Sequence, residues 1–220
     1  MHIEILVEDS SGAKLIEILL PKIIGFQAAE HSWRIKHYKG IGRVPSGLSS
    51  KAADPAKRIL LDQLRRLLSG YGNTPGVDAV IIVCDSDRRN CKEFLAELNA
   101  VLQQCSPAPN TLFRLAIEEM EAWFLGDRKA LLNAYPRAKK DVLKRYIQDS
   151  VCDTWELLAD AVHPGGLKEV KKSGFWLSGQ LKHDWAEKIG PEMDVEHNQS
   201  PSFGKFRDGL RRVCGFGFPL

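Results

Sequence analysis

The sequence lacks several features that would assign the protein to a class at once. It has no run of about 20 apolar residues, so no helix is expected to span a membrane. Its start turns almost directly into an apolar segment and lacks the pattern of a signal peptide. The five cysteines form no Cys-x-x-Cys pair, and their odd number disfavours a disulfide framework or a structural zinc site. We therefore expect a cytoplasmic protein with reduced thiols and no membrane partner.

The common nucleotide-binding loops are also missing. The Gly-rich stretch 39–47 has no Gly-Lys-Ser/Thr for a Walker loop, and Pro45 occupies the third glycine position of a dinucleotide fingerprint. This stretch is either an ordinary surface loop or a loop that contacts phosphates through Lys36, Lys39, Arg43 and Lys51. The net charge is only +3, so the total charge neither requires nor excludes nucleic acid as a partner.

The most informative stretch that is present runs from Val80 to Asp87. Val80 to Cys84 is an unbroken, mostly β-branched apolar run, as in a strand buried on both faces of a parallel sheet. It ends in Asp85-Ser86-Asp87, at the end of a strand where open α/β sheets bind their ligands. Both carboxylates could face one hard cation such as Mg²⁺. The alternative is that the two acids only cap a turn or the next helix.

The first half of the chain alternates between predicted strands and helices. Strands are predicted at 3–7, 33–38, 80–84 and 111–117, and one of the intervening helices at 55–68. This order predicts an α/β fold with a mainly parallel sheet flanked by helices. Right-handed crossovers would bring the carboxyl ends of all strands to one edge.

Two further groups of acids follow predicted strands. Glu8 follows the first strand, although a solvated loop acid would look the same in the sequence. Glu118, Glu119 and Glu121 follow the fourth strand; if this segment is helical, Glu118 and Glu121 share a face. Acids at a helix start are also favoured by the helix dipole alone. Because three strand ends carry carboxylates, we predict a divalent metal site formed by Glu8, Asp85, Asp87 and Glu121.

The remainder of the chain is predicted to be helical and more basic. Helices are expected at 136–147 and 154–162, and another begins at Ser200-Pro201, with serine as the cap and proline in the first turn. We therefore divide the chain into an α/β core, residues 1–127, and a helical, basic region, residues 128–220, packed on that core. Basic side chains are predicted to contact nucleic acid, unless they are merely solvated: Lys39, Arg43, Arg88, Lys139, Lys140, Lys171 and Lys172.

These motifs together resemble a known pattern. A hydrophobic strand followed by Glu, then a hydrophobic strand followed by Asp-x-Asp, in a βαβ frame, resembles the Toprim domain of topoisomerases, primases and OLD-type nucleases. More closely, the chain resembles an uncharacterised bacterial Toprim-like family, a domain of unknown function. The resemblance rests on residues 6–8, 85–87, 121–127 and the late Ser-Pro-Ser-Phe of residues 200–203. The chain departs from that family in having Asp9 where glycine is usual and Gly12 where a second acid is often found.

The resemblance implies a Toprim-like sheet and phosphodiester chemistry with Mg²⁺ or Mn²⁺. It implies that Glu8, Asp85 and Asp87 are catalytic, in a nuclease that acts on DNA or RNA and has a possible role in phage defence or a mobile element. Two alternatives remain open at this point. One is a non-catalytic module that binds nucleic acid or a partner protein, and the other is a hydrolase of small phosphoesters.

Overall fold

The computed structural model describes residues 1–28, 31–44, 54–150 and 153–216. Within these residues four strands form one sheet in which all neighbours run parallel, in the order β2-β1-β3-β4. The strands are β1 (His2–Val7), β2 (Ser32–His37), β3 (Ala79–Asp85) and β4 (Thr111–Ala116). The predicted α/β class with a parallel sheet flanked by helices is therefore confirmed.

The two central strands are buried on both faces, as their continuous apolar sequences indicate. Ile5 of β1 lies beside Ile81 of β3 and packs on one face of the sheet. Leu6 and its neighbour Ile82 pack on the other face. Because successive side chains of a strand alternate between faces, one apolar run supplies both hydrophobic layers.

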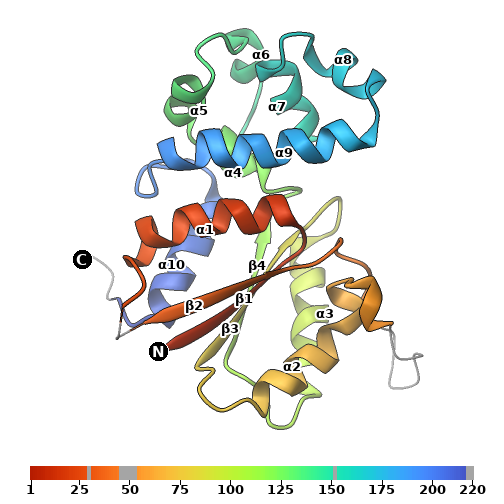
Figure 1. Cartoon of the computed structure of the whole chain (residues 1–220), viewed down its shortest axis with the longest axis vertical. Helices are drawn as coiled ribbons and strands as arrows, with labels where there is room; N and C mark the ends of the chain where they lie inside the picture. The colour runs from red at the N-terminus through yellow and green to blue at the C-terminus, as the bar shows by residue number, and fades with distance from the viewer. Residues whose placement is uncertain (29–30, 45–53, 151–152, 217–220) are drawn as a thin grey trace.

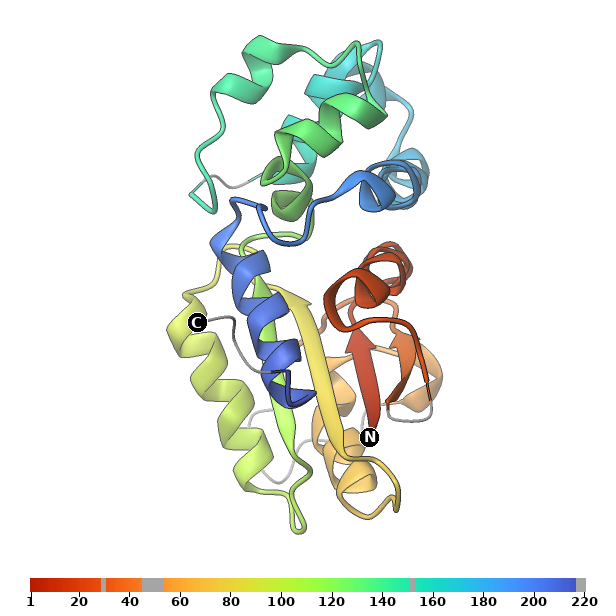
Figure 2. The ribbon, with the colours of Figure 1, turned by 90° about the vertical axis from the view of Figure 1, so that its left-hand side faces the viewer.

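Two pairs of helices cover these faces (Figures 1 and 2). One face carries α1 (Ser10–Ile24) and α10 (Pro201–Val213), and the other carries α2 (Leu64–Gly72) and α3 (Cys91–Gln103). The helix α10 thus returns from the C-terminal part of the chain to the sheet. The boundary between residues 127 and 128 stays a prediction.

The remaining helices form a second layer beyond the carboxyl ends of the strands, which point toward it in Figure 2. They are α4 (Glu121–Leu125), α5 (Arg128–Ala134), α6 (Lys140–Lys144), α7 (Thr154–Val162), α8 (Gly166–Lys172) and α9 (Phe175–Ile189). The chain passes from α9 through a short 3₁₀ turn, Gly190–Glu192, and then to α10. Helix α9 packs along α1. None of the helices described is both long and apolar enough to cross a bilayer.

Two predicted helices are shorter than the sequence indicates. The segment 55–68 forms two 3₁₀ turns, Pro55–Lys57 and Leu61–Gln63, and becomes α-helical only at Leu64. The reason is that the amides of Leu60 and Leu61 donate to Gly40 and Ile41 in the loop after β2, at 3.1 and 2.8 Å, instead of to a preceding turn.

The segment 136–147 is helical only over Lys140–Lys144. The amide of Lys139 donates to Ala161 of α7 at 2.8 Å, which holds the preceding residues outside a helix. By contrast, α7 spans the predicted residues, and the Ser200 hydroxyl caps α10 by accepting from the Phe203 amide at 3.3 Å. Residues 45–47 of the Gly-rich loop and Lys51 lie outside the described residues.

Candidate functional site

The connections of the sheet diverge between β1 and β3. From β1 the chain crosses to β2 on one side, and β3 and β4 follow on the other side of β1. Ligands of open α/β sheets bind at such a switch point, outside the carboxyl ends of the strands. Glu8 directly follows β1 and Asp85 ends β3. The amide of Asp85 donates a hydrogen bond to the Glu8 carboxylate at 3.3 Å. The structure thus places these two predicted site residues side by side.

This arrangement disfavours ionisation of both acids. Burial, followed by the charges of Asp9 and Asp87, raises the pKa of Glu8 to about 7, although the hydrogen bond from the Asp85 amide acts in the opposite direction. Burial and the charge of Glu8 raise the pKa of Asp85 well above its ordinary value, against the attraction of Lys182. A positive charge bound beside these two neighbouring carboxylates would favour their ionised forms and lower both pKa values.

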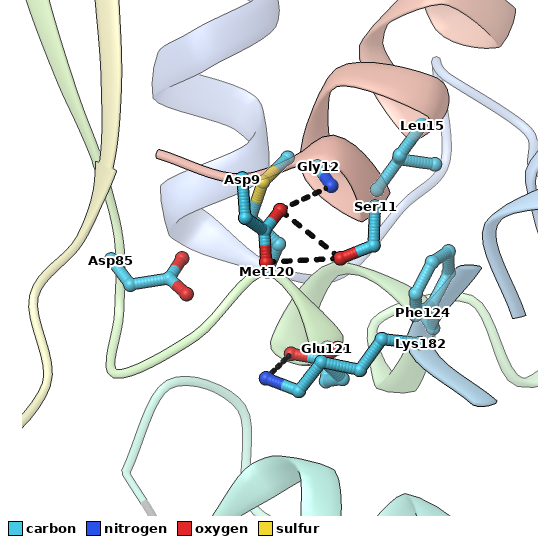
Figure 3. A pocket seen from close by; sticks show the side chains of 9 residues that line it. All are labelled: Asp9, Ser11, Gly12, Leu15, Asp85, Met120, Glu121, Phe124 and Lys182. Atoms are coloured by element: carbon cyan, nitrogen blue, oxygen red, sulfur yellow. Dashed lines mark hydrogen bonds and ion pairs between the residues drawn. The ribbon is translucent and has the colours of Figure 1, made fainter. Parts of the chain in front are cut away.

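A small pocket opens beside Asp85 (Figure 3). Its volume is about 10 Å³, close to the space that one water molecule needs. The carboxylates of Asp9, Asp85 and Glu121 line it together with the ammonium group of Lys182. The pocket therefore unites residues from the ends of β1 and β3, from α4 and from α9.

Lys182 is the one pocket residue contributed by the distant helix α9. Its side chain is 18% exposed, and its Nζ lies 2.9 Å from Glu119 and 3.4 Å from Glu121. Burial alone would lower the pKa of Lys182, but the charges of Glu121, Glu119 and Asp85 raise it, so the side chain stays protonated. The pKa of Glu121 is about 7, because burial raises it more than Lys182 lowers it.

The two departures from the family pattern have structural explanations. Asp9 is the N-cap of α1: its carboxylate accepts from the Gly12 amide at 2.7 Å and from the Ser11 hydroxyl at 3.0 Å. Gly12 cannot be replaced by an acid without rearrangement, because a Cβ there would lie 2.6 Å from the sulfur of Met120. Asp9 nevertheless still faces the pocket.

Asp87 lies at the same edge but is exposed, with a φ of 47°. Its amide donates to the carbonyl of Glu118 at 2.9 Å, and the buried hydroxyl of Ser86 accepts from the Glu118 amide at 2.7 Å. The turn after β3 is thereby joined to the segment after β4. Asp87 contributes negative charge near Glu8 without lining the pocket.

Glu118 does not share a helical face with Glu121. Its φ is 60°, and α4 begins only at Glu121. The Glu118 carboxylate instead accepts from the Thr154 amide at 2.8 Å and from the Asp153 amide, so it caps α7. Glu119 also accepts at this helix start, from the Trp155 amide at 3.1 Å. These two acids hold the helical layer to the sheet.

The site suits a hard divalent cation in its chemistry but is not a preformed metal centre. Within the described ranges, no group of three His, Cys, Asp or Glu side chains is arranged to hold a metal ion. The available donors are carboxylate oxygens, however, from Asp9, Asp85 and Glu121 in the pocket and from the adjacent Glu8, and Lys182 is the one cation that lines this pocket. Oxygen donors in excess of positive charge are what Mg²⁺ and Mn²⁺ prefer. Side chains would need to turn toward a bound ion.

The predicted basic residues do not form one surface. The loop with Lys39 and Arg43 lies beside the site, because the Gly40 amide donates to the carbonyl of Glu8 at 3.1 Å. Arg88 follows β3 and pairs with Asp153 at 3.2 Å. The other four lie at α6 and α8, and three of these form ion pairs within the helical layer: Lys139 with Asp160, Lys171 with Glu156 and Lys172 with Glu169. Lys140 is the exposed first residue of α6.

The two most specific sequence motifs meet in the core, although Glu121 of the first motif also lines the pocket. The indole NH of Trp123 donates to the Ser202 hydroxyl at 3.1 Å. The Trp123 ring stacks on Phe206, with centroids 5.0 Å apart, and meets Phe203 edge-on at 5.5 Å. The Glu-Ala-Trp and Ser-Pro-Ser-Phe segments thus fix α4 against α10.

A family model for a domain of unknown function, DUF4276, matches residues 7–211. The chain belongs to the DUF4276 family. No curated protein and no solved structure matches the chain. The resemblance to an uncharacterised family is therefore confirmed, whereas the relationship of this DUF4276 protein to Toprim domains and OLD-type nucleases stays a prediction.

Sequence reasoning overlooked Lys182 and Ser86. No sequence motif includes Lys182. It lies on a helix about 60 residues after the acids that it contacts, and only the tertiary fold brings it to them. Ser86 lies between the two predicted aspartates, and its position in that motif could have indicated its turn-forming role.

Proposed function

We propose that this DUF4276 protein is a Mg²⁺- or Mn²⁺-dependent phosphodiesterase that cleaves nucleic acid. The observation that supports this function best is the Glu8–Asp85 pair at the switch point of the sheet. Burial raises the pKa of both acids, and the charges of Asp9 and Asp87 raise that of Glu8 further, as the charge of Glu8 does for Asp85. A cation at this position would relieve the repulsion, and a phosphate bound to it would lie where α/β folds bind ligands.

Asp85 and Glu8 would hold the ion, assisted by Asp9 and Glu121 from the same pocket. When bound, the ion supplies polarisation of the phosphoryl group and activation of a water molecule. If Glu8 does not coordinate the ion, its carboxylate would instead serve as general base, taking a proton from the attacking water and returning it to the leaving oxygen. Lys182 holds Glu119 and Glu121 in place, and Lys39 and Arg43 lie where they can contact the substrate backbone.

The test measures cleavage of single- and double-stranded DNA and RNA with Mg²⁺, Mn²⁺ or chelator. We expect metal-dependent cleavage by the wild type and none by Asp85→Asn, which keeps the size of the side chain but removes its charge. Asp141→Asn is the matched control, because Asp141 is 96% exposed on α6 and does not line the pocket. Absence of metal-dependent cleavage by the wild type on every substrate would overturn the proposal.

Thermal melting gives a second measure that does not require activity. Mn²⁺ should raise the melting temperature of the wild type and of Asp141→Asn, because a ligand that binds only the native state stabilises it. Asp85→Asn should respond much less. Equal changes in the melting temperature of all three proteins would show that Asp85 does not bind the ion.

A second candidate function is a metal-free binding module. The observation that favours it is Lys182, whose ammonium already supplies positive charge to the acidic pocket. Binding of nucleic acid that neither requires metal nor leads to cleavage would select this alternative.

A further inference from the structure

A groove lies next to the acidic pocket, on the other side of the first turn of α1. Ser10 and Ala13 line the groove, whereas Ser11 and Gly12 line the pocket. In the same way, His183 lines the groove and the preceding residue, Lys182, lines the pocket. The groove has a volume of about 580 Å³ and runs along the edge strand β2, so it is large enough for a ligand that continues from the pocket.

The groove combines an aromatic ring with basic groups. Trp33, on β2, is half-buried and packs partly against the core, and the ring of His31 stacks on it at 6.0 Å. Lys14, His37 and His183 are the basic side chains of the lining, against one acid, Glu17. Arg34 also borders the groove, but its side chain points to the opposite face of the sheet from Trp33 and pairs with Glu4. Stacking rings beside cations are the features that bind single-stranded nucleic acid, since every base has a flat face and every linkage a negative charge.

The ion pairs of Lys14, a permanent cation of the groove, are long and exposed. Lys14 lies 3.6 Å from Glu17 and 3.8 Å from Glu187, whose side chains are 65% and 51% exposed. Arg34 is 63% exposed, but it lies 3.7 Å from Glu4, whose side chain is only 4% exposed, so only the pairs of Lys14 are fully exposed. Exposed pairs of this kind contribute little to stability, so a phosphate can take the place of the carboxylate partner.

We infer that this groove binds a single-stranded stretch of nucleic acid, with a base stacked on Trp33 and the backbone leading to the acidic pocket. The inference rests on the proposed function and names its substrate class. Trp33 and His37 are four residues apart on β2, about 13 Å along the strand. Since His37 pairs with Val7, next to Glu8, Trp33 contacts a base that is distant from the cleaved linkage. Paired bases cannot stack on Trp33, so a duplex should bind more weakly.

Binding is tested by fluorescence anisotropy of a labelled single strand of about 12 nucleotides, with the matching duplex as comparison and chelator present to prevent cleavage. Trp33→Leu keeps an apolar side chain on the core but removes the ring, and should weaken single-strand binding at least about fivefold, the smallest loss expected for one stacked base. Trp33→Phe keeps a ring and should bind within about twofold of the wild type. Trp155→Leu, a partly buried tryptophan on α7 outside the groove, is the matched control and should leave binding unchanged.

A small substrate separates this inference from the proposed function. Bis(p-nitrophenyl) phosphate is too short to reach Trp33, so Trp33→Leu should hydrolyse it as the wild type does. Unchanged oligonucleotide binding by Trp33→Leu, or equal binding of single strand and duplex, would overturn the groove even if the small substrate is cleaved. Trp33-dependent binding without cleavage of any substrate would support the groove and overturn the proposed function.

Discussion

The acids after β4 and the acids after β1 and β3 lie along the same edge of the sheet, but their surroundings differ. Glu118 accepts hydrogen bonds from two amides at the start of α7, and Glu119 accepts from one of its amides and pairs with Lys182. Among the described residues, the Glu8 carboxylate accepts only from the Asp85 amide, and no donor is bonded to the Asp85 carboxylate. The first group is neutralised by the protein itself, and the second is not.

The difference separates a structural role from a functional one for identical side chains. A carboxylate that is bonded to the amides of a helix start stabilises the fold, since it satisfies donors that would otherwise be unpaired. A pair of half-buried carboxylates with raised pKa values destabilises the fold, and such a pair is expected where a ligand supplies the missing charge. Glu121 lies between the two groups, because it contacts Lys182 and also lines the pocket.

The largest loss of stability is expected from Lys182→Met, which removes the ammonium group that pairs with the acids after β4. Glu119 and Glu121 would then lack their ammonium partner in a largely buried position, so we expect the free energy of unfolding to fall by about 3 kcal/mol. Urea denaturation measures this loss. Added Mn²⁺ should restore part of the stability of this variant, because the cation can replace the lost charge.

The control for this variant is Lys172→Met. Lys172 forms an exposed pair with Glu169 within α8, so its removal should change the free energy of unfolding by no more than about 0.5 kcal/mol. If both lysine variants are equally stable, Lys182 does not neutralise the acids after β4, and the contrast between the two groups fails.

A smaller change in the free energy of unfolding is expected when one glutamate of each group, Glu118 or Glu8, is replaced by alanine. Glu118→Ala removes the acceptor for two amides and should lower the free energy of unfolding by about 2 kcal/mol. Glu8→Ala removes an acid that resists ionisation, so in metal-free buffer at pH 8 it should leave stability unchanged or increase it. Urea denaturation of the two variants side by side checks the contrast, which would be broken by equal losses.

Sequence patterns were sufficient for the strands and for the Glu8–Asp85 pair. The apolar runs that precede Glu8 and Asp85 identify strands buried on both faces, and the rules for parallel sheets then bring their ends together. The same reasoning could not tell Glu118 from a site residue. Its role depends on the amides of Asp153 and Thr154, about 35 residues later in the chain, which no local pattern connects to it.

The failures have the same physical origin. The apolar periodicity of residues 55–68 is compatible with a helix, but long-range hydrogen bonds to Gly40 and Ile41 prevent one before Leu64. The sequence does not predict Lys182 as a site residue for the same reason, because only the packing of α9 along α1 brings it to the pocket. Local patterns predict elements, whereas the contacts between distant elements decide which polar groups are satisfied.

The experiment that examines the second group most directly measures the dependence of stability on pH without metal. The pKa of Glu8 and that of Glu121 rise from an ordinary 4.5 to about 7 on folding. Between these values the native state holds protons that the unfolded state has released, so the free energy of unfolding should fall as the pH increases from about 5 to about 7.

The raised pKa of Lys182 adds no slope in this range, because the side chain is protonated in both states there. The lowered pKa of Glu196 acts only at more acidic pH. Glu8→Gln removes one titrating group and also removes the charge that raises the pKa of Asp85. The difference in stability between this variant and the wild type should therefore increase from pH 5 to about pH 7 and then level off, and the contribution of the histidines common to both cancels. Urea denaturation across this range measures the difference, and saturating Mn²⁺ should reduce it, since the ion binds the ionised carboxylates. A constant difference at all pH values would mean that Glu8 ionises as freely in the native state as in the unfolded chain, and the acids after β1 and β3 would then be no different from those after β4.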